Sequence, residues 1–460
     1  MKSQSIEFDP ELIEKYNTFG PRYTSYPTAV QFTEAFSEAD YRAAAARSNE
    51  TAQPLSLYFH IPFCDTVCFY CACNKVWTRD RSKTTPYLQR LFQEIERQGA
   101  LFDRTRPVVQ LHWGGGTPTF ISHDEMQALM EMTRTHFNLL EDDSGEYSIE
   151  IDPREANADT VRLLRSQGFN RMSLGVQDFN PQVQKAVNRI QSEAETFNVL
   201  EAARAEGFKS INVDLIYGLP YQTRESFLET LEKLLAVSPE RFSVFNYAHL
   251  PDMFPTQRRM DARVMPSAEE KLAILSATIE RLTAAGYVYI GMDHFAKPED
   301  ELAVAQRVGK LYRNFQGYST HAECDLVAMG ATSISLVNDV YAQNEKTLND
   351  YYARIDAGQL AIFRGVRLNE DDRLRRDVIM KLMSNFELDY AVLSKQWGID
   401  FKTYFADALE RLKEMAADGL LHLDEQALTV LPKGRLLIRN IAMVFDAYLS
   451  RTTARYSKVI

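Results

Sequence analysis

The stretch Leu55-Ser-Leu-Tyr-Phe-His60-Ile-Pro-Phe-Cys64-Asp-Thr-Val-Cys68-Phe-Tyr-Cys71-Ala-Cys73 joins a predicted strand to a loop with four cysteines. Residues 55–60 are rich in apolar and aromatic side chains, which is typical of a buried strand. In α/β proteins, the loops that follow parallel strands collect at one end of the sheet, where active sites assemble. The sequence therefore places the cysteine loop at the functional end of a sheet.

Six more short apolar runs follow, separated by amphipathic helical stretches. We expect strands at 108–113, 147–152, 171–176, 211–217, 242–247 and 287–292. The stretch 269–285 places Leu272, Leu275, Ile279 and Leu282 on one face, which predicts a helix. Three of the helices should end at a glycine in a left-handed cap, namely at Gly168, Gly207 and Gly286.

Repeated strand–helix units predict a parallel sheet with right-handed crossovers. Six or seven units are too few for a closed eight-stranded barrel, so we expect an α/β fold with a partial, open (β/α)6-type barrel. A doubly wound sheet is the alternative. We expect an N-terminal arm or lid at 1–50, the barrel at 51–310, a connecting segment at 311–365 and a mostly helical, winged-helix-like domain at 366–460.

Composition and charge exclude several classes of protein. The 460 residues carry a formal net charge of −11, which argues against a nucleic-acid partner. The candidate recognition helix of the C-terminal domain is acidic as well, with Asp407, Glu410, Glu414 and Asp418 against Arg411 and Lys413. No apolar run approaches the ~20 residues of a membrane span, and the N-terminus lacks an apolar export signal. We therefore expect a cytoplasmic protein without a membrane or nucleic-acid partner.

The five cysteines are unevenly distributed, because four fall within residues 64–73 and Cys324 stands alone. Closely spaced cysteines in a reducing compartment indicate metal ligation or redox chemistry. The C-x3-C-x2-C spacing of Cys64, Cys68 and Cys71 can hold three corners of an iron–sulfur cube and leave its fourth iron open. A zinc site with Cys73 as fourth ligand is the alternative, although a C-x-C pair makes it cramped. Cys324 is expected to be a small buried side chain.

Other polar groups follow the predicted strands. The segment 112–119 contains three consecutive glycines, which permit a close approach of the backbone to a ligand. Glu150, Asp152 and Arg154 follow the third strand, Gln177 the fourth, and Asp214 lies on the fifth. As a set, these groups should converge at the mouth of the barrel.

These motifs resemble those of the radical S-adenosylmethionine (SAM) enzymes. Over essentially the whole length, the chain is most similar to the oxygen-independent coproporphyrinogen III oxidases, also called coproporphyrinogen dehydrogenases. The resemblance rests on residues 20–28, 64–73, 111–119, 175–180, 246–250 and 291–296.

The resemblance implies a [4Fe-4S] cluster on Cys64, Cys68 and Cys71, with Cys73 as a motif residue that is no ligand. It implies two SAM molecules. The reactive one would contact Tyr58, Gly115, Glu150 and Ile334, and the second one Tyr70, Gly116, Thr117, Gln177, Arg189, Asp214 and Ala248. The catalytic positions would be Tyr58, Glu150 and Arg189.

The implied reaction is the oxidative decarboxylation of two propionates of coproporphyrinogen III to vinyl groups, giving protoporphyrinogen IX in porphyrin biosynthesis. A deoxyadenosyl radical derived from SAM would abstract a hydrogen from each propionate. The implied partners are the substrate and a one-electron donor of flavodoxin or ferredoxin type, and the chain would be a monomer. We further hypothesise that Arg22, with Tyr23 and Thr24, closes over the substrate and contacts a propionate.

Two other functions stay open. A related haem-binding chaperone would use the same cluster loop without decarboxylation, although residues 20–28 and Cys73 favour the enzyme. A zinc-bearing nucleic-acid protein would use the cysteine loop and the winged-helix-like tail, but the net charge disfavours it.

Overall fold

The computed structural model describes residues 5–449, 456 and 458, and its contacts divide the chain into two compact units. The barrel unit comprises residues 32–274 and 323–367, and the C-terminal unit comprises residues 1–31, 275–322 and 368–460. The four predicted segments, 1–50, 51–310, 311–365 and 366–460, stay predictions. Among the described residues, no helix has both the length and the apolar composition needed to cross a bilayer.

The barrel unit is built on a parallel sheet whose strands advance in one direction, in the order β9-β8-β7-β6-β4-β1. Their bounds are β1 Leu55–Ile61, β4 Pro107–Gly115, β6 Glu146–Ile151, β7 Arg171–Gln177, β8 Ser210–Tyr217 and β9 Arg241–Asn246. The first six predicted strands are thereby confirmed. A progression in one direction is that of a partial barrel, whereas a doubly wound sheet would reverse its order.

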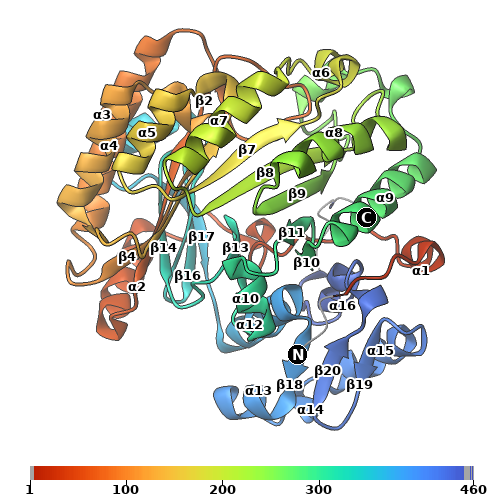
Figure 1. Cartoon of the computed structure of the whole chain (residues 1–460). Coiled ribbons are helices and arrows are strands. Elements are labelled where there is room, and N and C mark those ends of the chain that lie inside the picture. Colours follow the sequence, from red (N-terminus) through yellow and green to blue (C-terminus); the bar gives the residue numbers. More distant parts are fainter. Residues whose placement is uncertain (1–4, 450–455, 457, 459–460) are drawn as a thin grey trace. The chain divides into compact units, whose positions relative to one another are not determined.

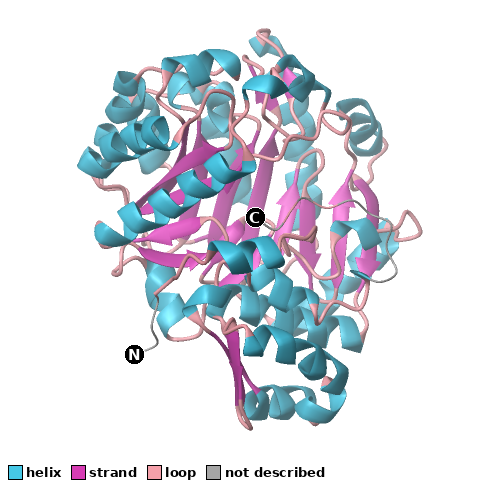
Figure 2. Cartoon of the chain, turned by 90° about the vertical axis from the view of Figure 1, so that its right-hand side faces the viewer, coloured by secondary structure: helices cyan, strands magenta, loops and turns pink. Residues whose placement is uncertain are grey.

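Helices connect the strands and cover one face of the sheet (Figures 1 and 2). Their bounds are α2 Glu38–Thr51, α3 Thr84–Gly99, α4 His123–His136, α5 Ala158–Ser166, α6 Pro181–Ala186, α7 Glu193–Ala205, α8 Arg224–Val237 and α9 Ala268–Ala284, the last of which crosses the division between the units. Leu57 and Phe59 of β1 share a buried cluster with Leu91 of α3 and Leu129 of α4. Burial of this apolar surface stabilises the sheet against its helices.

The predicted glycine caps are confirmed. Gly168, Gly207 and Gly286 have φ angles of +102°, +77° and +90°, which are left-handed conformations that glycine adopts without strain. The helix predicted at 269–285 is α9.

Further strands that the sequence did not predict extend the sheet beyond β1. β14 (Asp325–Met329) runs parallel to β1, and β15 (Ile334–Val337), β16 (Val340–Asn344) and β17 (Ile362–Arg367) follow as antiparallel neighbours, with α11 (Leu348–Asp356) between the last two. β14 and β16 are buried at every position, so they lack the alternation that marks a half-exposed strand. The small pairs are β2 (Phe63–Cys64) with β3 (Val76–Trp77) and β5 (Asn138–Leu139) with β4.

The C-terminal unit is mostly helical. Its helices are α1 Pro10–Lys15, α10 Glu301–Arg307, α12 Glu370–Asn385, α13 Tyr390–Trp397, α14 Phe401–Tyr404, α15 Ala406–Ala417 and α16 Ile438–Met443. The strands are β10 Val288–Gly291 paired with β11 His294–Ala296, β12 Tyr312–Asn314 with β13 Gly317–Ser319, and a sheet of β18 Glu387–Asp389, β20 Ala427–Val430 and β19 Leu421–Leu423. Helices followed by the β19–β20 hairpin confirm the predicted winged-helix-like arrangement. The acidic helix at 407–418 is α15.

The N-terminal residues of this unit are held by its own carboxylates. Tyr23 is 1% exposed and donates a hydrogen bond of 2.8 Å to Asp446, and Arg22 forms an ion pair with Asp293. The Tyr23 hydroxyl is therefore buried and engaged within its own unit, and the lid hypothesis stays a prediction. The proposed role of Arg22 stays a prediction.

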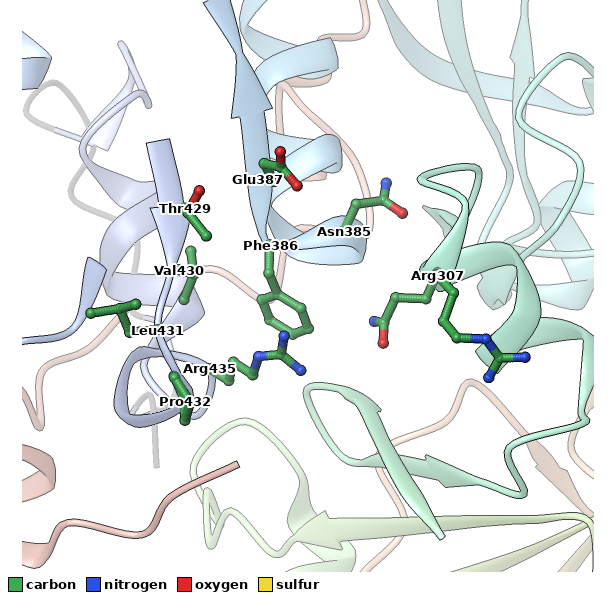
Figure 3. Close-up of a pocket in the computed structure, with 10 residues that line it drawn as sticks. Arg307, Asn385, Phe386, Glu387, Thr429, Val430, Leu431, Pro432 and Arg435 are labelled. Atoms are coloured by element: carbon green, nitrogen blue, oxygen red, sulfur yellow. The ribbon is translucent and has the colours of Figure 1, made fainter. Parts of the chain in front are cut away.

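A cavity of about 190 Å³ lies within the C-terminal unit, beside α12 and the strand β20. Figure 3 shows the guanidinium group of Arg435 next to the ring of Phe386, and the separation of the group from the ring centroid is 4.7 Å. All the predicted site residues belong to the barrel unit, and none of them lines this cavity.

Candidate active site

A second cavity, of about 270 Å³, lies at the carboxyl ends of the parallel strands in the barrel unit. The predicted site residues that line it are Cys64, Cys68, Tyr70, Cys71, Gly115, Gly116, Thr117, Glu150, Gln177, Arg189 and Asp214. The expected convergence is confirmed for these positions. Tyr58, Ala248 and Ile334 are not among the lining residues.

Strand alternation explains why so many polar groups meet here. Successive side chains of a strand point to opposite faces, and the apolar ones face the helices. The interior positions are accordingly polar: Tyr58 and His60 on β1, His112 on β4, Ser148 and Glu150 on β6, Ser173 on β7, and Asn212 and Asp214 on β8. The alternation of polar and apolar residues along each strand thus gives the barrel a polar interior and an apolar exterior that faces the helices.

The glycine segment at the end of β4 holds the base of the cysteine loop. The amide of Gly116 donates to the carbonyl of Ile61 at 2.8 Å, and that of Thr117 to the carbonyl of Phe63 at 2.8 Å. A Cβ atom at Gly116 would lie 2.7 Å from the carbonyl oxygen of Pro62, so a side chain cannot be accommodated there. The far end of the loop is held as well, because the amide of Thr78 donates to the carbonyl of Cys64 at 2.9 Å.

The cysteine thiols have different electrostatic surroundings. A hydrogen bond from Cys73, helped by Lys75, outweighs burial and lowers the pKa of Cys71 to about 6. Burial raises the pKa of Cys64 to about 12, although the Thr117 hydroxyl donates to its sulfur at 3.5 Å. Because metals bind the thiolate, ligation would displace the Cys64 proton.

These residues fit an iron–sulfur cluster with an open iron better than a structural zinc. A structural zinc is enclosed by its four ligands. Here Cys64, Cys68 and Cys71 line a cavity that continues to Gln177 and Asp214, which leaves room for a ligand beyond the metal. Cys73 also lines the cavity, so its assignment as a residue that is no ligand stays a prediction.

Glu150 presents an ionised carboxylate to the cavity. Partial burial alone would raise its pKa, but a hydrogen bond and charge interaction with His112 and the amide of Gly115 together lower that pKa. The amide of Gly115 donates to Oε2 at 3.1 Å, and Nε2 of His112 lies 3.5 Å from Oε1. The ring of Tyr58 stacks on that of His112 with centroids 5.8 Å apart. His112 begins the glycine segment 112–119, but the sequence analysis assigned it no role.

Asp214 lies in a network of small polar side chains. Ser173 donates to Oδ2 at 2.7 Å, and Nδ2 of Asn212 donates to Oδ1 at 2.8 Å. Burial, with a contribution from the charge of Glu150, raises the pKa of Asp214 to about 6 despite these donors. The sequence analysis did not predict Ser173 and Asn212 as site residues. Their alternation with apolar residues along β7 and β8 was the signal that could have placed them in the interior.

Arg189 enters the cavity from the segment after α6 and is 6% exposed. It donates to Oδ2 of Asp152 at 2.9 Å and to the carbonyl of Gly175. Its Nε is buried and has no hydrogen-bond partner among the residues that the structure describes. A buried orphan donor next to a cavity indicates that a ligand supplies the acceptor.

Gln177, just beyond a bulge in β7, has a left-handed φ of +67°. Backbone strain of this kind is frequent at functional sites.

Gln257 is a buried residue that the sequence analysis missed, since no motif surrounds it. Its Nε2 donates to the carbonyls of Tyr70 at 3.1 Å and Ala248 at 3.4 Å. It thus joins two segments that were predicted to hold SAM.

Ile334 lies at the start of β15, two strands from β1. The predicted SAM contacts of Ile334 and Ala248 stay predictions.

The comparisons with known proteins first define the class. Residues 58–234 match the Radical SAM superfamily, and residues 368–437 match the HemN C-terminal domain. The chain is therefore a radical SAM protein, a class that uses a [4Fe-4S] cluster and SAM.

Similarity to full-length proteins narrows the class. The chain is 54% identical over 457 residues to the oxygen-independent coproporphyrinogen III oxidase of Pseudomonas aeruginosa, covering 99% of both chains. It is 52% identical over 463 residues to that of Escherichia coli K12, covering both chains completely. A solved structure described as "Coproporphyrinogen III oxidase (HemN) from Escherichia coli is a Radical SAM enzyme" matches with a TM-score of 0.92 and 50% identity, over 97% of this chain and 100% of that chain. This chain belongs to the family of oxygen-independent coproporphyrinogen III oxidases.

Proposed function

We propose that this chain is an oxidoreductase that converts coproporphyrinogen III to protoporphyrinogen IX by oxidative decarboxylation of two propionates to vinyl groups. The observation that carries the proposal is a single cavity lined by Cys64, Cys68 and Cys71 together with the glycine segment and Arg189. The bound cluster would supply an electron to SAM, and the ensuing radical chemistry would remove CO2 and hydrogen from each propionate.

The protein residues bind and orient the cofactors. Glu150, which is ionised and faces the cavity, can accept hydrogen bonds from the amino group of a SAM molecule. The glycines at 115 and 116 let that molecule approach the backbone. The proposed contacts of the same SAM with Tyr58 and Ile334 come from the family resemblance.

A second SAM molecule is proposed beside the first. The buried guanidinium of Arg189 can bind a methionine carboxylate, and the Asp214 carboxylate can accept from ribose hydroxyls. Tyr70 offers an aromatic ring for the adenine. Thr117, Gln177 and Ala248 complete the proposed contacts.

The remaining proposals concern partners. A flavodoxin- or ferredoxin-type protein would donate the electron, and the chain would act as a monomer in the cytoplasm. The resemblance to the family supports each of these proposals.

An anaerobic assay tests the proposed function. Reconstituted protein is incubated with SAM, a one-electron reductant and coproporphyrinogen III, and the products are separated by chromatography. We expect protoporphyrinogen IX, with loss of two CO2 per macrocycle. Stable haem binding without formation of vinyl groups would instead identify a haem chaperone.

The raised pKa of Asp214 predicts a pH dependence of SAM binding. With a folded-state pKa of about 6, the carboxylate accepts from ribose hydroxyls at pH 7.5 but is mostly protonated at pH 5.5. The affinity of the site that contains Asp214 should fall roughly fourfold over this interval, which anaerobic calorimetry would measure. Burial raises this pKa above its unfolded value, so the protonated form stabilises the fold below pH ~4, and that stabilisation is lost as the pH rises through 6.

Asp214→Asn is the matched variant. It should bind SAM with an affinity that is flat between pH 5.5 and 7.5. Its melting temperature should exceed that of the wild type by a margin that grows between pH ~4 and 6 and is constant above pH 6. A wild-type affinity without pH dependence would contradict the assigned contact.

A further inference from the structure

Asp152 lies between two guanidinium groups beside the cluster loop. Its Oδ1 accepts from Nε of Arg154 at 3.0 Å, and its Oδ2 accepts from Arg154 at 2.6 Å and from Arg189 at 2.9 Å. All three side chains are largely buried, with exposed fractions of 11%, 15% and 8% for Asp152, Arg154 and Arg189. The group carries two positive charges and one negative charge.

The local sequence explains the position of Arg154. Asp152 follows β6 and caps the short 3-10 helix Pro153–Glu155, accepting from the amide of Arg154 at 3.1 Å. Proline restricts the backbone at the first position of this turn. Arg154 therefore lies two residues from Asp152, its counter-ion. Its guanidinium donates to both carboxylate oxygens of Asp152, and such a bidentate contact fixes the orientation of an arginine side chain.

Both arginines reach the same cluster cysteine. Arg189 lies 3.6 Å from the sulfur of Cys68, and Arg154 lies 3.9 Å from it. Cys68 is 8% exposed, so solvent screens these charges weakly. Hydrogen bonds to ligand sulfurs and nearby charge are established determinants of the potential of iron–sulfur clusters.

We propose that Arg154, oriented by Asp152, is a positioning residue that raises the reduction potential of the cluster through the sulfur of Cys68. Reduction adds a negative charge to the cluster, and a fixed cation near a ligand sulfur stabilises that charge. Arg154 is the residue that isolates this effect, because Arg189 also has a buried Nε donor that we assign to SAM, and its replacement would disturb both roles. The inference rests on cluster ligation by Cys68 and deepens the proposed function.

The test compares Arg154→Gln and Arg154→Lys with the wild type in full-length, anaerobically reconstituted protein. Iron and sulfide are counted first, and the midpoint potential is then measured by redox titration followed with electron paramagnetic resonance, without substrate. Arg154→Gln should lower the equilibrium constant for one-electron reduction about tenfold, which is a midpoint about 59 mV more negative. Arg154→Lys keeps the charge and should restore most of the potential. Arg162→Gln is the control, because Arg162 is 62% exposed and forms ion pairs with Asp159 and Glu206, away from the cysteine loop. The midpoint potential of the cluster in this variant should equal that of the wild type.

Several results would overturn the inference. They are an unchanged potential in a fully loaded Arg154→Gln protein, an equal shift in Arg162→Gln, or a loss of cluster loading in both Arg154 variants, which would show that Arg154 maintains the loop structure instead. Because the titration uses no porphyrinogen, its outcome is independent of the proposed substrate. An inactive wild type with a shifted potential in Arg154→Gln would refute the function and keep the inference.

Discussion

Replacing Cys68 by alanine should abolish both cluster binding and turnover. Cys68 is the most buried of the three predicted ligands, and removal of its sulfur leaves two thiolates for a cluster that requires three. We expect the reconstituted variant to lack the brown colour and to retain less than about a tenth of the iron and sulfide of the wild type. Product formation from coproporphyrinogen III should fall below detection.

Cys324→Ala is the matched control, since it removes one partly buried thiol outside the loop. It should load a complete cluster and keep full activity. The Cys68→Ala protein should retain the wild-type circular dichroism spectrum, because the hydrogen bonds at both ends of the loop do not involve the Cys68 sulfur. A loaded, active Cys68→Ala protein would disprove the ligand assignment.

The second large effect concerns stability and the opposite end of the sheet. Arg106, just before β4, donates to Asp325 of β14 at 2.5 Å, to Ser48 of α2 at 2.8 Å and to the carbonyl of Gln53 at 2.6 Å. The side chains of Arg106 and Asp325 are 1% and 4% exposed. Arg106→Met leaves the Asp325 carboxylate buried without its cation, which should cost about 3–5 kcal/mol and lower the melting temperature by roughly 5–8 °C.

Two further variants separate charge loss from volume change. Arg106→Met combined with Asp325→Leu removes both charges and should recover a large part of the lost stability. Arg162→Met makes the same substitution on the surface and should change the melting temperature by less than about 1 °C. Equal melting temperatures for the Arg106→Met protein and the wild type would show that the buried pair contributes nothing.

Periodicity and glycine positions were sufficient to predict most of the barrel. The six predicted strands, β1, β4, β6, β7, β8 and β9, combine apolar residues on the helix-facing side with a bounded length. Gly168, Gly207 and Gly286 mark the ends of helices, because the backbone there requires a left-handed conformation. β14 escaped prediction because it pairs with β1, about 270 positions earlier in the sequence. β16 escaped prediction because it is buried at every position and lacks the alternation of a half-exposed strand.

The site was predictable to the extent that its residues form local motifs. The spacing of the cysteines and the run of glycines indicate a cofactor site, because few other structures require this combination. Gln257 and the contact of Arg154 with Cys68 could not be predicted, because each depends on the distance between segments separated by many residues. Burial of the Tyr23 hydroxyl against Asp446 was unpredictable for the same reason.

The hydrogen bonds from Gly116 and Thr117 to the chain just before Cys64 have a thermodynamic consequence. In small metal-dependent domains, the metal must supply the free energy that folds its own ligands. Here the sheet backbone already supports the base of the ligand loop, so little conformational entropy remains to be lost when the cluster is inserted. A chain that loses its cluster to oxygen should therefore remain folded and able to receive a new one without first refolding.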